Sequence, residues 1–269
     1  MNRRAIDPVV REQLEEAIRE IQVMAGLTGL TPQLRIGRPS IDSVAQSSPF
    51  VQHGFKTIRG GASGKPAPSM FKSAGQDARP RALAIGVTSA DYKDGKTTVA
   101  ISLASCLAHD FGAQVMLVDA DLHTASVGKE YGLEGRRGLS DVIAGTAQLP
   151  EVANRFRQAP LTVVTAGSGG LDPARMARSE HLVSIIDHMK AISGFVVMDL
   201  PATLRSMNTP VLANRCDGVI VVVRAGQTTR RDLERVLELL QDANIIGVVV
   251  NRQHSHVPGW VDRLLALPR

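Results

Sequence analysis

Residues 90–97, which read ADYKDGKT, constrain the fold of this chain more than any other segment. They match the phosphate-binding pattern G-x-x-x-x-G-K-[ST], except that Ala90 stands at the first glycine. An apolar run typical of a buried strand, residues 82–89, precedes them, and a helical pattern over residues 97–109 follows. A strand, a glycine-containing loop and a helix in this order predict a P-loop within an α/β fold.

The rest of the chain continues this alternation of strands and helices. Further strands are expected over residues 114–121, 161–166, 195–199, 218–223 and 245–251, and further helices over residues 139–144, 173–191 and 229–242. The strand runs are almost continuously apolar, which indicates strands buried on both faces. We therefore predict a three-layer P-loop fold, in which helices cover both faces of a mostly parallel sheet.

The chain divides into four parts by composition. Residues 1–28 contain an amphipathic helix expected over residues 7–25, and residues 29–81 form a basic linker or flexible arm. In that linker 20 of 53 residues are Gly, Pro or Ser, which exceeds the roughly 25–30% typical of low-complexity segments. The nucleotide-binding domain is expected over residues 82–251, and residues 252–269 form a C-terminal tail.

The net charge of +5 lies entirely in the first third of the chain. Residues 1–81 hold 12 basic and 7 acidic side chains, whereas residues 82–269 hold 19 of each. A nucleic-acid partner is therefore not expected of the P-loop domain. No apolar run approaches the roughly 18–20 residues that cross a bilayer, so we expect a cytoplasmic chain without a transmembrane segment of its own.

Each position of the P-loop has a chemical reason. Gly95 lets backbone amides approach phosphate oxygens, Lys96 is placed to bridge the β- and γ-phosphates, and the Thr97 hydroxyl is placed to bind Mg²⁺. The sequence thus predicts ATP and Mg²⁺ as cofactors. The expected nucleotide-binding residues in this segment are Ala90, Lys93, Asp94, Gly95, Lys96, Thr97 and Thr98.

Carboxylates follow two of the expected strands. Asp119 and Asp121 end the second strand, and Asp199 ends the fourth. Ligands of open parallel sheets bind beyond the carboxyl ends of the strands, so these side chains are candidates for holding Mg²⁺ together with Thr97. With Lys96 they are also the candidate catalytic residues. The alternative is that they are solvated residues in turns.

The carboxylate motifs resemble those of one family. LVDADL at residues 117–122 resembles the Walker A′ motif of bacterial tyrosine kinases (BY-kinases), and VVMDLPA at residues 196–202 resembles their Walker B motif. Residues 161–182 and 217–251 resemble the segment between these motifs and the closing section of the same family. The wider relatives are the MinD/ParA-type ATPases, which carry a lysine where this chain has Asp91, so the kinase branch is favoured.

The resemblance implies a Mg-ATP-dependent protein-tyrosine kinase or ATPase of exopolysaccharide or capsule biosynthesis. It implies a partner in the inner membrane, a polysaccharide co-polymerase or chain-length regulator, which would recruit the chain to the inner face of the cytoplasmic membrane. It further implies that Asn251 contacts adenine, although as a bare residue Asn251 reads equally well as a turn at a strand end. Assembly into a homo-oligomer is left open, because the family's ring-forming segment has His53 at its acidic position.

Other departures leave the activity open. The chain has two tyrosines, Tyr92 and Tyr131, and none lies in the tail, so autophosphorylation of a tail tyrosine is chemically excluded. Either tyrosine could be a substrate, but a structural role is favoured for each. His123 replaces an arginine of the family, and Leu200 and Ala202 alter the Walker B motif. The alternative function is a non-kinase nucleotide switch or pseudokinase of MinD/ParA type that regulates assembly of a membrane complex.

Overall fold

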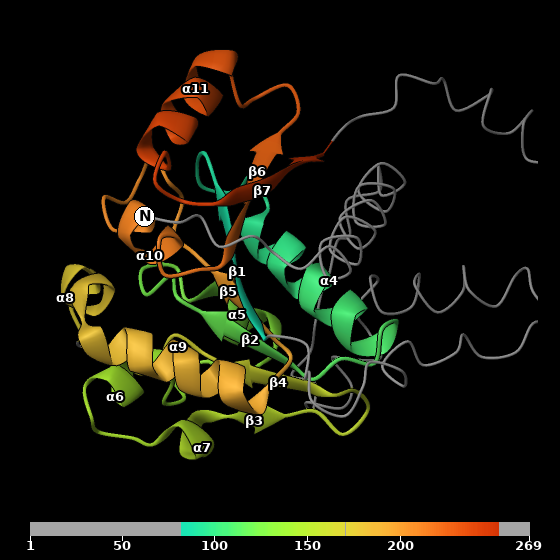
Figure 1. Cartoon of the computed structure of the whole chain (residues 1–269), viewed down its shortest axis with the longest axis vertical. Coiled ribbons are helices and arrows are strands. Elements are labelled where there is room, and N and C mark those ends of the chain that lie inside the picture. Colours follow the sequence, from blue (N-terminus) through green and yellow to red (C-terminus); the bar gives the residue numbers. More distant parts are fainter. Residues whose placement is uncertain (1–81, 170, 253–269) are drawn as a thin grey trace, which may run out of the picture.

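A computed structural model describes residues 82–169 and 171–252, which form a seven-stranded sheet between two layers of helices (Figure 1). The predicted N-terminal helix over residues 7–25, the linker over residues 29–81 and all but the first residue of the tail lie outside the described residues. Within the described residues, no helix is long and apolar enough to cross a membrane.

The sheet has the strand order β3-β4-β2-β5-β1-β6-β7. Its strands are β1 (Leu83–Ser89), β2 (Val115–Asp119), β3 (Asn154–Arg155), β4 (Leu161–Val164), β5 (Phe195–Asp199), β6 (Gly218–Arg224) and β7 (Ile245–Asn251). Every neighbouring pair is parallel except β3 and β4. The mostly parallel sheet predicted from the apolar runs is thereby confirmed.

Strand β1 occupies the point where the chain changes its direction across the sheet. It pairs with β5 on one side and with β6 on the other, while the chain itself goes from β1 to β2, beyond β5. Ligands of such sheets bind at this switch point, outside the carboxyl ends of the strands. The P-loop follows β1 directly, so the fold places it at the switch point.

The helices divide between the two faces of the sheet. One face packs against α4 (Lys96–His109) and α5 (Ser126–Glu130). The other face packs against α6 (Leu139–Ile143), α7 (Leu149–Val152), α8 (Pro173–Arg178), α9 (Glu180–Ile192), α10 (Thr209–Ala213) and α11 (Arg230–Leu239). All residues of β1, β2 and β5 are buried, which explains why these strands are apolar throughout instead of alternating.

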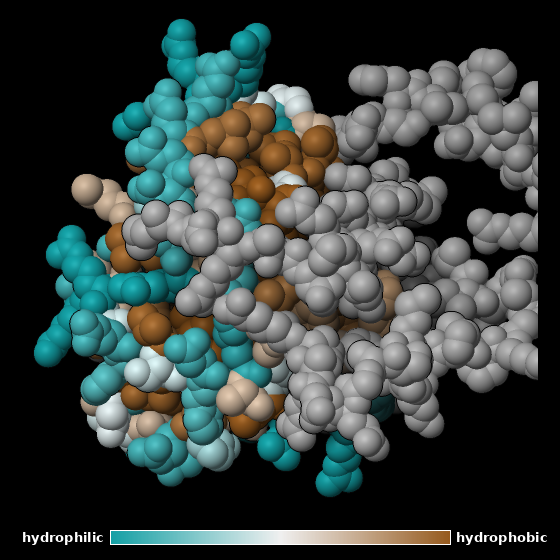
Figure 2. Space-filling model, in the orientation of Figure 1, coloured by the Kyte–Doolittle hydropathy of each residue, from teal (hydrophilic) through white to brown (hydrophobic). Residues whose placement is uncertain are grey.

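Helix α11 shows the opposite pattern, because only one side of it is covered. Arg230 pairs with Glu234 and Arg235 pairs with Glu238 on its exposed side, and this part of the surface is hydrophilic in Figure 2. These arginines form the solvated helix face that is the default for such a pattern.

Four short elements escape the sequence pattern. Helices α5, α7 and α10 have five, four and five residues, and β3 has two. Hydrophobic periodicity is read over windows of about 11–18 residues, so elements of this length are easily missed. The helical stretch expected over residues 173–191 consists of two helices, which meet at Ser179 because this residue adopts an extended conformation with ψ of 129°.

Candidate nucleotide-binding site

The loop between β1 and α4 has the backbone that its sequence requires. Gly95 precedes the first turn of α4 with φ of 98°, and Lys93 also adopts a positive φ of 64°. The Asp94 carboxylate accepts a hydrogen bond from the Asp91 amide at 2.8 Å, which closes the loop on itself. A Cβ atom at position 95 would lie 2.0 Å from the side-chain nitrogen of Asn251, so a glycine is needed there for space as well as for conformation.

Asn251 reaches this loop from β7, the edge strand that is separated from β1 by β6. It is the last residue of β7, and its Nδ2 atom donates a hydrogen bond to the Asp94 carbonyl oxygen at 2.8 Å. The side chain thus fixes the backbone of the P-loop one residue before Gly95. The resemblance assigns an adenine contact to Asn251, and the geometry adds a contact with the protein itself.

We expect the substitution Asn251→Ala to weaken nucleotide binding up to about tenfold, because the loop loses one hydrogen bond worth about 1 kcal/mol. Isothermal titration with an ATP analogue measures the effect. Asn244→Ala is a matched control, since Asn244 Nδ2 also donates to a backbone carbonyl at 2.8 Å, that of Asp217, before the start of β7. A control variant that loses as much affinity as Asn251→Ala would contradict the assignment.

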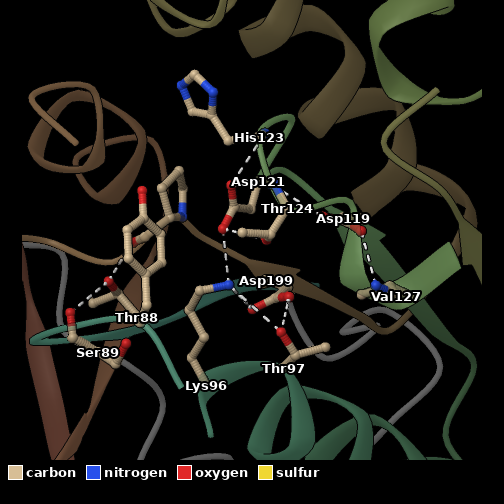
Figure 3. Close-up of polar contacts among 12 residues, drawn as sticks. Thr88, Ser89, Lys96, Thr97, Asp119, Asp121, His123, Thr124, Val127 and Asp199 are labelled. Atoms are coloured by element: carbon tan, nitrogen blue, oxygen red, sulfur yellow. Dashed lines mark hydrogen bonds and ion pairs between the residues drawn. The ribbon is translucent and has the colours of Figure 1, made fainter. Parts of the chain in front are cut away.

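Lys96 and Thr97 begin α4 and point into a buried group of carboxylates (Figure 3). The Lys96 Nζ atom lies 2.9 Å from Asp121 Oδ2 and 3.5 Å from Asp199 Oδ1. The Thr97 hydroxyl donates a hydrogen bond to Asp199 Oδ2 at 2.6 Å. Lys96 is only 6% exposed, and Asp121 and Asp199 are fully buried. The alternative of solvated turn residues is therefore wrong for this group.

Asp119 belongs to the same group but is bound differently. It lies directly opposite Asp199 in the register of β2 and β5. Its two carboxylate oxygens accept hydrogen bonds from the backbone amides of Asp121 at 3.1 Å and Val127 at 2.9 Å. Asp119 therefore shapes the turn from β2 to α5, whereas Asp121 contacts Lys96 directly and accepts a further hydrogen bond from the Thr124 hydroxyl at 2.7 Å.

The electrostatics of the group separate its members. Burial alone would lower the pKa of Lys96, but the charges of Asp199 and Asp121 outweigh it and raise this pKa. Burial would raise the pKa of Asp121, but Lys96 and Thr124 outweigh it and lower this pKa. Burial raises the pKa values of Asp119 and Asp199, and the charge of Asp199 adds to the rise at Asp119. Lys96 and Asp121 are thus held as an ion pair. The positive charge near the other two carboxyl groups, those of Asp119 and Asp199, is too small to offset the effect of burial on their pKa values.

A bound cation would compensate for this shortage of positive charge. Three buried carboxyl groups face one buried ammonium group, and Asp199 Oδ1 accepts no hydrogen bond. The side-chain atoms available as metal ligands are carboxylate and hydroxyl oxygens, which suit Mg²⁺. The described residues contain no complete cage of His, Cys, Asp or Glu ligands, as expected for a P-loop site, where nucleotide phosphates and water supply the remaining ligands. The residues present therefore fit Mg²⁺ held with a nucleotide.

The remaining predicted residues lie around this centre. Ala90 is buried at the end of β1, Lys93 is exposed on the outer turn of the loop, and Thr98 is exposed in the first turn of α4. His123 is exposed, and its backbone amide donates to Asp121 Oδ1 at 3.2 Å (Figure 3). The position that carries an arginine in the family thus lies beside the carboxylates.

Sequence reasoning missed Arg205. This residue lies after β5, and its guanidinium donates two hydrogen bonds to the Asp91 carboxylate of the P-loop, one from Nε at 2.6 Å and one from Nη2. The contact lowers the pKa of Asp91 through the hydrogen bond from Arg205. No spacing in the sequence connects two residues that are 114 positions apart, so only the folded chain reveals the contact.

Comparison with known proteins identifies the class to which this fold and site belong. The profile of the CobQ/CobB/MinD/ParA nucleotide binding domain (CbiA) matches residues 85–258, more than half of the chain. The chain therefore belongs to this family of nucleotide-binding domains.

Within that class, the chain is similar to bacterial tyrosine kinases. It is 26% identical over 181 residues to the tyrosine-protein kinase CpsD of Streptococcus agalactiae serotype III, a match that covers 66% of this chain and 78% of the relative. Its fold matches the kinase domain of the Escherichia coli tyrosine kinase ETK with a TM-score of 0.63 and 21% identity, over 67% of this chain and 71% of that one.

A second solved structure shares the fold and contains ligands. The cobyrinic acid a,c-diamide synthase from Mycobacterium smegmatis, with bound ADP and magnesium, matches with a TM-score of 0.55 and 19% identity. The match covers 68% of this chain and 80% of that one. The resemblance to BY-kinases as a branch of the MinD/ParA-type ATPases is confirmed by these comparisons together with the family profile.

Proposed function

We propose that this chain is a Mg-ATP-dependent phosphotransferase of the BY-kinase type. The observation that carries the proposal is the buried group in which Lys96 contacts Asp121 and Asp199, and Thr97 contacts Asp199. Burying three carboxyl groups around one lysine costs free energy, because the negative charge is not fully compensated. A P-loop that served only as a structural turn would not need this arrangement.

The protein residues have distinct tasks in this proposal. Bound Mg²⁺ supplies positive charge to the phosphates, and Thr97, Asp121 and Asp199 are the residues that would hold it. Lys96 neutralises negative charge that develops on the transferred phosphoryl group. Asp121 is kept ionised by Lys96, so it can accept a hydrogen bond from an acceptor hydroxyl and orient it. Asp119 fixes the turn that carries Asp121.

The cellular setting of the proposal rests on the relatives. We place the chain in exopolysaccharide or capsule biosynthesis, because the kinase relatives resemble it across the whole P-loop domain. The partner in this setting is an inner-membrane chain-length regulator or co-polymerase, which would recruit the cytoplasmic chain to the membrane. Genes for glycosyltransferases and a co-polymerase beside the coding gene would support this setting.

A second candidate function is a nucleotide-dependent switch without kinase activity. Two observations favour it: the tail has no tyrosine, and the bond between Asp91 and Arg205 couples the P-loop to the segment after β5. A change in the P-loop upon nucleotide exchange would reach that segment through Arg205 and alter the surface offered to a membrane complex.

Labelled ATP distinguishes the two functions. The purified full-length chain is incubated with γ-labelled ATP and Mg²⁺, with and without the cytoplasmic tail of the co-polymerase and with a random copolymer of glutamate and tyrosine as acceptor. Label on protein or copolymer that is absent with the Lys96→Met variant is the result expected of a kinase. Release of phosphate without labelled tyrosine supports the switch, and binding of ATP without either reaction supports a pseudokinase.

A further inference from the structure

The two tyrosines of the chain lie in opposite environments. Tyr131 is 8% exposed, and its ring packs edge-on against Phe156 with 5.1 Å between the ring centroids. Burial raises the pKa of Tyr131 to about 12. The predicted structural role is therefore correct for Tyr131, whose phenol is closed to an enzyme acting from outside.

Tyr92 lies on the P-loop itself and is 46% exposed. Its backbone amide donates a hydrogen bond to Asp91 Oδ1 at 2.6 Å, so the residue sits on an ordered turn. Because the whole sequence contains two tyrosines and one is in the core, Tyr92 is the single tyrosine of this chain that offers its hydroxyl to a second protein.

The surroundings of Tyr92 suit a phosphate group. The Arg205 guanidinium donates two hydrogen bonds to the carboxylate of Asp91, the residue that precedes Tyr92. Lys93, the next residue along the chain, is exposed as well. An arginine fork binds a phosphate dianion at least as well as a carboxylate, so a phosphate on Tyr92 would compete with Asp91 for Arg205.

We propose that Tyr92 is a phosphorylation site, that a second copy of this chain phosphorylates it, and that Arg205 receives the phosphate. The inference rests on the proposed kinase function. In the reaction, the Tyr92 hydroxyl oxygen forms a bond to the γ-phosphorus of ATP, the bond between that phosphorus and the oxygen of the β-phosphate breaks, and ADP leaves. The phenolic proton passes to a base of the second copy or to water.

The position of Tyr92 on the loop favours transfer from a second copy over transfer within one molecule. Backbone amides of a P-loop turn toward the bound phosphates, so an exposed side chain on this loop points away from its own nucleotide. Lys96, by contrast, is buried four positions later in the chain. Tyr92 can therefore enter the site of another molecule more readily than its own.

Phosphorylation at this position would also limit the activity that produces it. A phosphotyrosine adds about two negative charges beside a loop that must bind the negative phosphates of ATP. When Arg205 turns to the new phosphate, the Asp91 carboxylate loses its partner, and the repulsion of nucleotide increases further. We expect the phosphorylated chain to bind ATP about tenfold more weakly than the unmodified chain.

Transfer between copies can be tested with the intact chain. Wild-type protein is mixed with tagged Lys96→Met protein and γ-labelled ATP, and the label is located by peptide mass spectrometry. The expected result is label at Tyr92 of the tagged variant, no label in a tagged Tyr92→Phe, Lys96→Met double variant, and retained label in a tagged Tyr131→Phe, Lys96→Met variant. Label at any other residue of the chain, with Tyr92 unmodified, would overturn the proposal.

A copolymer of glutamate and tyrosine separates this proposal from the proposed function. Labelled copolymer with an unlabelled chain would overturn only the assignment of Tyr92, whereas absence of label on both would overturn the kinase function and the assignment together. The role of Arg205 has its own measurement, the rate at which a tyrosine phosphatase removes the phosphate from Tyr92. We expect faster removal from an Arg205→Ala variant, and an equal rate would show that Arg205 does not hold the phosphate.

Discussion

Replacement of Lys96 by methionine is expected to slow phosphoryl transfer and ATP hydrolysis by a factor of about 100–1,000 or more. The ammonium group of Lys96 is the one cation that the described residues bring into contact with Asp121 and Asp199. Its removal takes away both the charge that stabilises the transferred phosphoryl group and the partner that keeps Asp121 ionised. Phosphate release and copolymer labelling, measured at saturating ATP, give the size of the effect.

The same variant should lose stability when no nucleotide is bound. Removing one partner of a buried ion pair typically costs about 3–5 kcal/mol, and protonation of the carboxyl groups left behind would lower this cost. Lys190→Met is a matched control, because Lys190 forms a mostly buried ion pair with Asp217 at 2.5 Å. Asp217 directly precedes β6, so this ion pair lies at the end of the sheet away from the P-loop. The control should lower the unfolding temperature while keeping the catalytic rate. Wild-type rates for Lys96→Met would contradict the role given to this lysine.

The two carboxylates of the Walker A′ segment are expected to fail in different ways when each is changed to asparagine. Asp121→Asn should lower the rate about 100-fold or more, because it removes the charge that pairs with Lys96 and the carboxylate that would orient an acceptor hydroxyl. Asp119→Asn should mainly destabilise the fold, by about 1–3 kcal/mol. Asp119 accepts hydrogen bonds from two backbone amides, and in the variant one of these amides would face an NH₂ group, which cannot accept.

Two measurements on each variant separate these effects. Thermal unfolding reports the loss of stability, and the hydrolysis rate at a temperature well below both transitions reports the loss of activity. The predicted result is a large loss of rate with a small loss of stability for Asp121→Asn, and a larger loss of stability for Asp119→Asn. If the two variants lost rate and stability in the same proportion, the division of roles between Asp119 and Asp121 would be wrong.

Much of this architecture was predictable because long, strongly patterned segments leave a signal. The buried strands β1, β2, β5 and β6 are apolar throughout, and the loop before α4 has a sequence that few other structures require. The antiparallel strand β3 was not predictable, since two residues carry no periodicity. Arg205 was not predictable either, because its partner Asp91 is distant in the sequence and an isolated arginine after a strand looks like any other surface residue.

The sequence by itself determined the class of the molecule: a P-loop between a buried strand and a helix, and carboxylates at the ends of two other strands. It left open whether those carboxylates are solvated, what Asn251 touches, and which tyrosine is accessible. The tertiary structure decided these points, because each depends on residues that are distant in the chain but close together in the folded protein. Pairing of β2 with β5 brings Asp119 beside Asp199, and the end of β7 brings Asn251 to the P-loop. The ring of Tyr131, just after α5, packs against Phe156, just after β3, and is buried, whereas Tyr92 on the P-loop is exposed.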